Sequence, residues 1–132
     1  MPIFVVEDRK FRVQFVHSGH DLKGSHPTGV PGGFRQIVDN LAKSLKRRVS
    51  FCEIAEEQWS EDVRQHLFIP ISQGFAICHW TDTFVKSKGR AISLWKALRA
   101  SGLDGVEKEQ IAVAMGWASL ADLKLAASDF LF

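Results

Sequence analysis

Hydrophobic and polar residues follow two patterns along the first half of the chain, and together they predict strands and one helix. Runs of β-branched and aromatic residues at 3–6 and 11–16, the second alternating with polar residues, are typical of a β-hairpin. Residues 17–33 show no period and are rich in glycine and proline, which indicates a long loop. Apolar residues recur at steps of three and four over residues 34–48, as on one face of a helix, before residues 49–54 return to a strand pattern.

Short elements are expected in the middle of the chain. Ser60 precedes two acidic residues, as is typical of a helix N-cap, and predicts a short helix over residues 61–67. Residues 68–71 and 74–80 have the composition of two extended segments. Pro70 indicates an edge position in a sheet, because proline cannot donate a hydrogen bond to a neighbouring strand.

Three helices are expected in the last third of the chain. The longest runs from residue 83 to about 101, with Gly102 as its C-terminal stop. The sequence from Asp104 to Glu107 matches a capping box that begins a second helix, which ends at Gly116. A third helix is expected to start at Ser119.

The predicted order of elements is ββ-α-β-α-ββ-α-α-α, which favours the α+β class. We expect a small antiparallel sheet with helices packed on one face and a helical hairpin at the C-terminus. The 132 residues, 45% of them hydrophobic, suffice for one domain with its own core. We divide it into a sheet-plus-helix core at 1–101 and the C-terminal hairpin at 102–132.

Composition excludes several classes of protein. Cys52 and Cys78 are the only cysteines, too few for a disulfide framework. No apolar run approaches the roughly 20 residues that a membrane helix needs. Residues 1–8 show neither a basic leader nor a cleavage site typical of a secretory signal. We therefore expect a cytoplasmic protein without a membrane partner.

The formal net charge of +2 conceals a strong segregation of charge. Residues 33–50 carry five bases and one acid, and residues 86–99 carry five bases and no acid. The remainder has seven bases against fourteen acids, a net charge of −7. A nearly neutral total therefore does not exclude a polyanionic partner, provided that the two basic segments converge in space.

The basic segments are candidates for contact with nucleic acid or another anion. Both fall on predicted helices, and backbone N–H groups at the start of the second helix would attract phosphate. Trp59 or Trp80 could supply a stacking surface. The alternative is an ordinary solvated helix face, whose ion pairs stabilise little. The candidate residues are Arg35, Lys43, Lys46, Arg47, Arg48, Lys86, Lys88 and Arg90.

Metal binding and catalysis have weaker support in the sequence. His17, His20 and His26 are candidate metal ligands in the predicted loop, but the paired cysteines typical of zinc motifs are missing. Cys78 and His79 are adjacent on a predicted strand, so their side chains point to opposite faces and cannot pair directly as nucleophile and base. A pairing of Cys78 with His17 or His20 across the sheet stays open. We expect no cofactor and favour a role other than that of an enzyme.

Residues 111–119 have the rhythm of a helix-turn-helix, with an alanine and then a glycine in the turn. The helix that would read DNA carries only one base, Lys124, against Asp122 and Asp129. A recognition helix must contact phosphates and base edges, and this one is poorly suited to do so. We expect the pair of helices to serve packing or a partner protein.

The segment over residues 76–98, A-I-C-H-W-T-D-x-F-x-K-x-x-G-R-A-I-x-L-x-x-A-L, resembles a strand–D-x-F-x-K-x-x-G-R–helix segment of small accessory proteins encoded by phages and prophages. The resemblance covers about a sixth of the chain. It implies a mobile-element context in which small proteins act by binding, and it implies no catalytic residues.

Three functional hypotheses follow. The first is a phage-type accessory protein that binds nucleic acid, or a complex that handles nucleic acid, through the two basic helices. The second is an interaction module that inhibits a host enzyme such as a defence nuclease, in an anti-defence, anti-CRISPR-like role; its acidic segments would mimic phosphate, or its C-terminal hairpin would dock. The third is a metal-dependent hydrolase that uses the histidine-rich loop.

Overall fold

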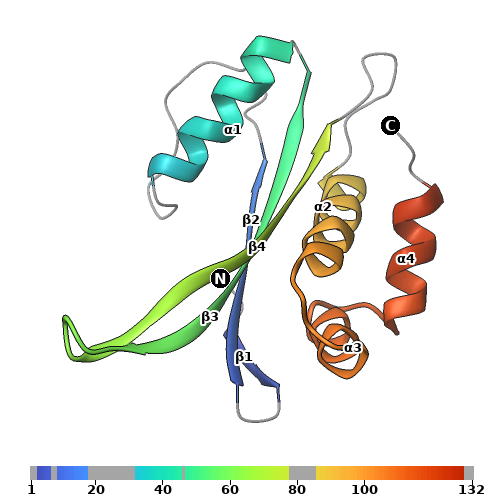
Figure 1. The fold of residues 1–132 in the computed structure, drawn as a ribbon. Coiled ribbons are helices and arrows are strands. Elements are labelled where there is room, and N and C mark those ends of the chain that lie inside the picture. The colour runs from blue at the N-terminus through green and yellow to red at the C-terminus, as the bar shows by residue number, and fades with distance from the viewer. Residues whose placement is uncertain (1–2, 7–8, 18–31, 46, 78–85, 130–132) are drawn as a thin grey trace.

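A four-stranded antiparallel sheet and four helices form the computed structural model, which describes residues 3–6, 9–17, 32–45, 47–77 and 86–129 (Figure 1). The strands lie in the order of the chain: β1 (Ile3–Val6), β2 (Arg9–His17), β3 (Val49–Ser60) and β4 (Gln65–Ile77). The helices are α1 (Gly32–Leu45), α2 (Lys86–Ala100), α3 (Gly105–Ala114) and α4 (Leu120–Asp129). The α+β class, the antiparallel sheet and the N-terminal hairpin are confirmed.

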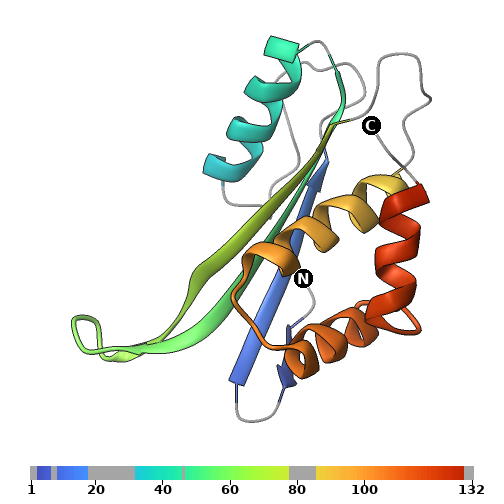
Figure 2. The same ribbon diagram turned by 45° about the vertical axis from the view of Figure 1, so that its right-hand side comes forward.

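The main core lies between one face of the sheet and the helices that follow it (Figure 2). Alternate residues of a strand share a face, so Phe11 and Val13 of β2 and Ile54 of β3 point to the same side. There they pack against Leu94 and Leu98 of α2. Residues of α3 and α4 complete this cluster, so the C-terminal helices share one core with the sheet.

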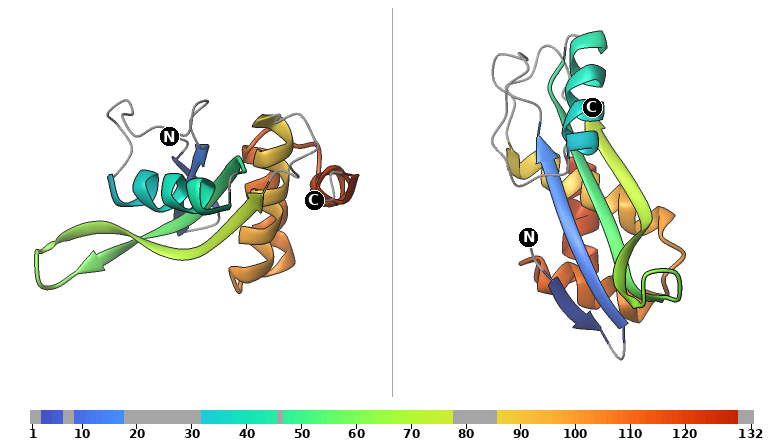
Figure 3. Two further views of the ribbon diagram at one scale, coloured as in Figure 1. Left: turned by 90° about the horizontal axis from the view of Figure 1, so that it is seen from above. Right: turned by 90° about the vertical axis from the view of Figure 1, so that its left-hand side faces the viewer.

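Helix α1 lies on the opposite face, which differs from the expected one-sided arrangement (Figure 3). Val38 and Ala42 of α1 pack with Val16 and Phe51, which alternate with the residues that face α2. The sheet is therefore covered on both faces at the end where β2 finishes and β3 begins. The seven consecutive buried residues at the start of β3 reflect this, since a strand covered on both faces loses its apolar–polar alternation.

The prediction of a short helix over residues 61–67 is wrong. The prediction of two separate extended segments at 68–71 and 74–80 is also wrong. Residues 61–64 form the turn of a long hairpin, and β4 runs without a break from Gln65 to Ile77. The Ser-Glu-Asp sequence that suits an N-cap also suits a turn. Cross-strand pairing extends both strands beyond the rest of the sheet. Pro70 lies on an edge strand, as expected, beside an irregularity in the pairing.

The projecting part of this hairpin, residues 57–68, is called the ribbon here. It lies beyond Glu56, the last residue of β3 that pairs with β2. Trp59 and His66 face each other across the ribbon with ring centroids 5.2 Å apart, and the indole N–H of Trp59 donates to Glu61 at 2.9 Å. These local contacts stabilise the ribbon, which stands clear of the helices in Figure 1.

The expected helix ends in the C-terminal part are confirmed. Gly102 has a φ of +75°, the left-handed conformation that ends α2. Asp104 accepts from the backbone N–H of Glu107 at 2.7 Å and Glu107 accepts in return, which completes the capping box of α3. Ser119 caps α4 by accepting from the N–H of Asp122. Within the described ranges, no helix combines the length and apolar character needed to cross a membrane.

Candidate functional site

Both basic helices reach the same end of the sheet, although they lie on opposite faces of it. At this end β2 finishes at His17, β3 begins at Val49 and β4 finishes at Ile77, and the cross-strand pairs place these residues side by side. Helix α1 ends and helix α2 begins here (Figure 1). We call this region the basic end. Its described cations are Lys43, Arg47, Arg48, Lys88 and Arg90.

On the side of α1, the chain turns sharply into β3. The backbone N–H of Arg47 donates to the carbonyl of Ala42 at 3.1 Å, which closes the last turn of the helix. Lys43 is exposed, and Arg47 and Arg48 are half-buried. Cations at this position also complement the negative end of the α1 dipole.

On the side of α2, a glycine brings the helix into contact with the sheet. A Cβ on Gly89 would lie 1.9 Å from the hydroxyl of Ser50, so only glycine fits between the helix and β3. Ser50 is fully buried, and its Oγ lies 2.7 Å from Nδ1 of His17. Lys88 and Arg90 flank this glycine, so the contact fixes their backbone beside the start of β3.

Five of the eight predicted basic residues lie toward this end of the sheet, divided between its two faces. Arg35 stands eight residues before Lys43, about 12 Å away along the axis of α1. Lys46 lies outside the described residues, and Lys86 opens α2 with only its backbone described. Lys96 and Arg99, which belong to the same basic segment of the sequence, lie toward the other end of α2.

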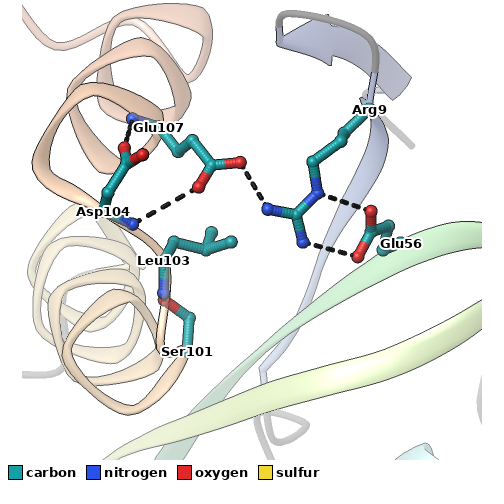
Figure 4. A network of polar contacts seen from close by, with 6 residues as sticks. All are labelled: Arg9, Glu56, Ser101, Leu103, Asp104 and Glu107. Atoms are coloured by element: carbon teal, nitrogen blue, oxygen red, sulfur yellow. Dashed lines mark hydrogen bonds and ion pairs between the residues drawn. The ribbon is translucent and has the colours of Figure 1, made fainter.

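Five acidic residues lie away from the basic end, three on the ribbon and two in α3, and Glu56 precedes the ribbon. At the base of the ribbon, Glu56 and Glu107 form a network with Arg9 (Figure 4). Arg9 binds Glu56 through Nε and Nη2, at 2.6 and 2.7 Å, and binds Glu107 of α3 through Nη1 at 2.5 Å. The Arg9 guanidinium holds the pKa of Glu56 below its usual value. The network thus ties the sheet to the C-terminal helices.

A second carboxylate, Glu53, is buried in the sheet with incomplete pairing. Its side chain is 1% exposed, and Oε1 has only a distant ion pair with Arg12 at 3.8 Å. Gln14 lies opposite Glu53, and within the described residues neither Oε1 of Glu53 nor either polar atom of Gln14 has a hydrogen-bond partner. Burial raises the pKa of Glu53, because removing water penalises the charged form.

We expect Glu53→Gln to raise the free energy of unfolding by about 1 kcal/mol at pH 7, because the amide avoids the desolvation of a charge. A raised folded-state pKa makes ionised Glu53 unfavourable above that pKa, and the penalty disappears as the pH falls toward the unfolded pKa. The advantage of the variant should therefore shrink in acid. Urea unfolding between pH 7 and 4 measures it.

Exposed Glu61→Gln is the control for the Glu53 variant and should leave stability nearly unchanged. A Glu53→Gln protein less stable than the wild type at pH 7 would contradict this account of the buried carboxylate.

The candidate metal ligands and the cysteines receive no support as a functional site from the described residues. Within them, no three His, Cys, Asp or Glu side chains could hold a metal ion together. His17 is hydrogen-bonded to Ser50, and His20 and His26 lie outside the described ranges. Cys52 is buried, which raises the pKa of its thiol, and Cys78 lies outside the description.

The helix-turn-helix segment serves packing. Leu123 of α4 is buried in the main core, and Ala127 packs in a small cluster with Ile92 of α2. Lys124, the single base of α4, lies over the ring of Trp95 at 5.9 Å.

The aromatic candidates require a correction. Trp59 lies on the ribbon, far along β3 from the basic end, and Trp80 lies outside the described residues. No pattern in the sequence singles out Trp117, which lines a cavity together with Arg90. Only the folded chain brings these two residues together, since 27 positions separate them.

Comparison with known proteins adds no relative. No protein family, curated protein or solved structure matches this chain.

Proposed function

We propose that the protein is a non-enzymatic accessory protein of the phage type that binds nucleic acid, or a complex that handles nucleic acid, through its basic end. One observation carries the proposal. Lys88 and Arg90 flank the glycine that packs on Ser50, at the end of the sheet where Arg47 and Arg48 lead into β3. Two segments some 40 residues apart in sequence thus supply cations to one end of the molecule.

The position of these cations on α2 supports an anionic partner. The first turn of a helix carries the positive end of its dipole, where acidic residues are favourable and basic ones cost about 0.3–1 kcal/mol each. Three bases occupy the first five positions of α2, and its first turn has no acid. Phosphate groups bound there would relieve this repulsion.

The distribution of charge over the molecule favours an extended polyanion as the partner. The sole acid of α1 and α2 is Asp39, which is buried, whereas the ribbon carries three acids and α3 carries two. A molecule with one basic end and acids elsewhere orients itself toward a phosphate backbone. Each phosphate neutralised also releases counterions, which adds to the affinity.

The test reverses charge at two positions of one helix. Lys88→Glu with Arg90→Glu should weaken binding to a fluorescent oligonucleotide at least about tenfold near 0.1 M salt, since two attractive contacts become repulsive. Lys96→Glu with Arg99→Glu is the matched control, because it makes the same change of charge at the other end of α2. Equal loss of affinity in both double variants would contradict a localised site.

The ribbon favours docking to a protein as a second candidate function. Trp59 and Val63 are half exposed there, beside Glu57, Glu61 and Asp62. Exposed apolar side chains with acidic neighbours suit a basic protein surface, as in a module that inhibits a host nuclease. Wild-type protein that fails to bind any oligonucleotide in the charge-reversal test would favour this candidate over the first.

A further inference from the structure

We propose that a cavity beside the basic end holds one unpaired base of a single-stranded nucleic acid. This inference rests on the proposed function and names the form of nucleic acid. The cavity has a volume of about 220 Å³ and lies between β2, the first turns of α2 and the loop that joins α3 to α4. It is lined by Phe15, Ser87, Arg90, Met115, Gly116 and Trp117.

The lining combines the two features that hold a nucleotide. Phe15 and Trp117 offer aromatic surface, and both are only partly buried, so that part of each side chain remains accessible. Arg90 supplies a cation and Ser87 a hydroxyl, and both are exposed. Proteins that bind single strands pair aromatic faces for the bases with a basic path for the backbone.

The fold fixes both aromatic walls. Phe15 lies two residues before His17 on the same face of β2, and the two rings are parallel to within 3° with centroids 6.5 Å apart. His17 is held in turn by Ser50 at 2.7 Å. On the other wall, the backbone N–H of Trp117 donates to the carbonyl of Ala112 at 3.0 Å, which anchors the loop to α3. Few of the residues that line the cavity therefore have to become ordered when a base enters.

Arg90 connects the cavity to the rest of the proposed site. It lines the cavity and also flanks Gly89 at the basic end, beside Lys88. A base in the cavity would place its own phosphate near Arg90. A base inside a duplex is paired and stacked, and extracting it costs a few kcal/mol. The arrangement therefore favours a free end or an unpaired stretch.

The experiment compares one sequence as a single strand and as a blunt duplex of equal length, with binding followed by fluorescence anisotropy. The wild-type protein should bind the single strand more tightly. Trp117→Leu should lower affinity for the single strand about tenfold, within the range measured for loss of one stacked base, and leave the duplex unaffected. Trp117→Phe should retain most of the affinity, because it keeps an aromatic face.

Trp59→Leu is the matched control, since it removes the same type of side chain from the ribbon, and it should change neither affinity. The inference would be overturned if the wild type bound the single strand and the duplex equally well. It would also be overturned if Trp117→Leu lowered the affinity for both by the same factor. The proposed function would then stand, provided that the reversal of Lys88 and Arg90 still weakened binding. Loss of single-strand affinity with Trp117→Phe as large as with Trp117→Leu would also contradict stacking. A wild type that binds neither form would refute direct binding of nucleic acid, and with it this inference.

Discussion

Substitution of Gly74 by alanine should destabilise the protein by about 3 kcal/mol, at the upper end of the usual cost of overpacking. Gly74 lies on β4, where α2 crosses the sheet. A Cβ there would lie 2.2 Å from the carbonyl oxygen of Ser93 and 2.6 Å from the backbone nitrogen of Ala97. Both obstacles are backbone atoms, which cannot rotate away. The helix would have to move off the sheet and give up contacts of Leu94 and Leu98 in the main core.

Urea unfolding measures this effect, and Gly105→Ala is the control. A Cβ on Gly105 would meet nothing within 4 Å, and alanine is favoured over glycine in a helix such as α3. We expect the control variant to be as stable as the wild type or slightly more so. If Gly74→Ala changed stability no more than Gly105→Ala does, the close packing of α2 on β4 would be wrong.

Substitution of Arg9 by glutamine should cost about 2–3 kcal/mol. The change removes both hydrogen bonds to Glu56 and the contact with Glu107, whose side chain is 7% exposed and would be left as a buried charge without its partner. Arg9 itself is 39% exposed, so the cost should be below that of a fully buried pair.

The difference in stability between the wild type and Arg9→Gln should depend on pH. Arg9 lowers the pKa of Glu56, so this pair stabilises the wild type above the unfolded pKa of the carboxyl and ceases to do so as the pH falls through its folded pKa. The gap between wild type and Arg9→Gln should therefore narrow in acid. Lys10→Gln is the control, because Lys10 makes a single, more exposed pair with Glu57 at 3.5 Å. Equal effects of the two substitutions at pH 7 would refute the role of the network.

Patterns in the sequence correctly predicted the elements whose formation depends on residues close together in the chain. The alternation at 11–16 and the capping box at Asp104 depend on neighbouring residues, and both are confirmed. The helix predicted over residues 61–67 is wrong because Ser60 and the two acidic residues after it suit a turn as well as a helix N-cap. Pairing of Trp59 with His66 across the hairpin, a contact between strands, selects the turn.

The site could be predicted only in part, for a related reason. The sequence shows which residues are basic, but the pairing of β2, β3 and β4 decides which ends of the two helices lie at the same end of the sheet. The close approach at Gly89 and the network around Arg9 join residues far apart in sequence, with 98 positions between Arg9 and Glu107. No local signal marks such contacts. The segregation of charge raises the question of whether the two basic segments converge, and only the fold places the end of α1 and the start of α2 at one end of the sheet.

The dependence of binding on salt tests the central claim most directly. The slope of the logarithm of the binding constant against the logarithm of salt concentration counts the phosphates that the protein neutralises. Lys88→Glu with Arg90→Glu should reduce the magnitude of this slope by about 1.4–1.8, which corresponds to two lost contacts on a single strand or a duplex. Lys96→Glu with Arg99→Glu should leave it unchanged. A slope that is the same in the wild type and in the Lys88 and Arg90 double variant would contradict the basic end as the nucleic-acid contact.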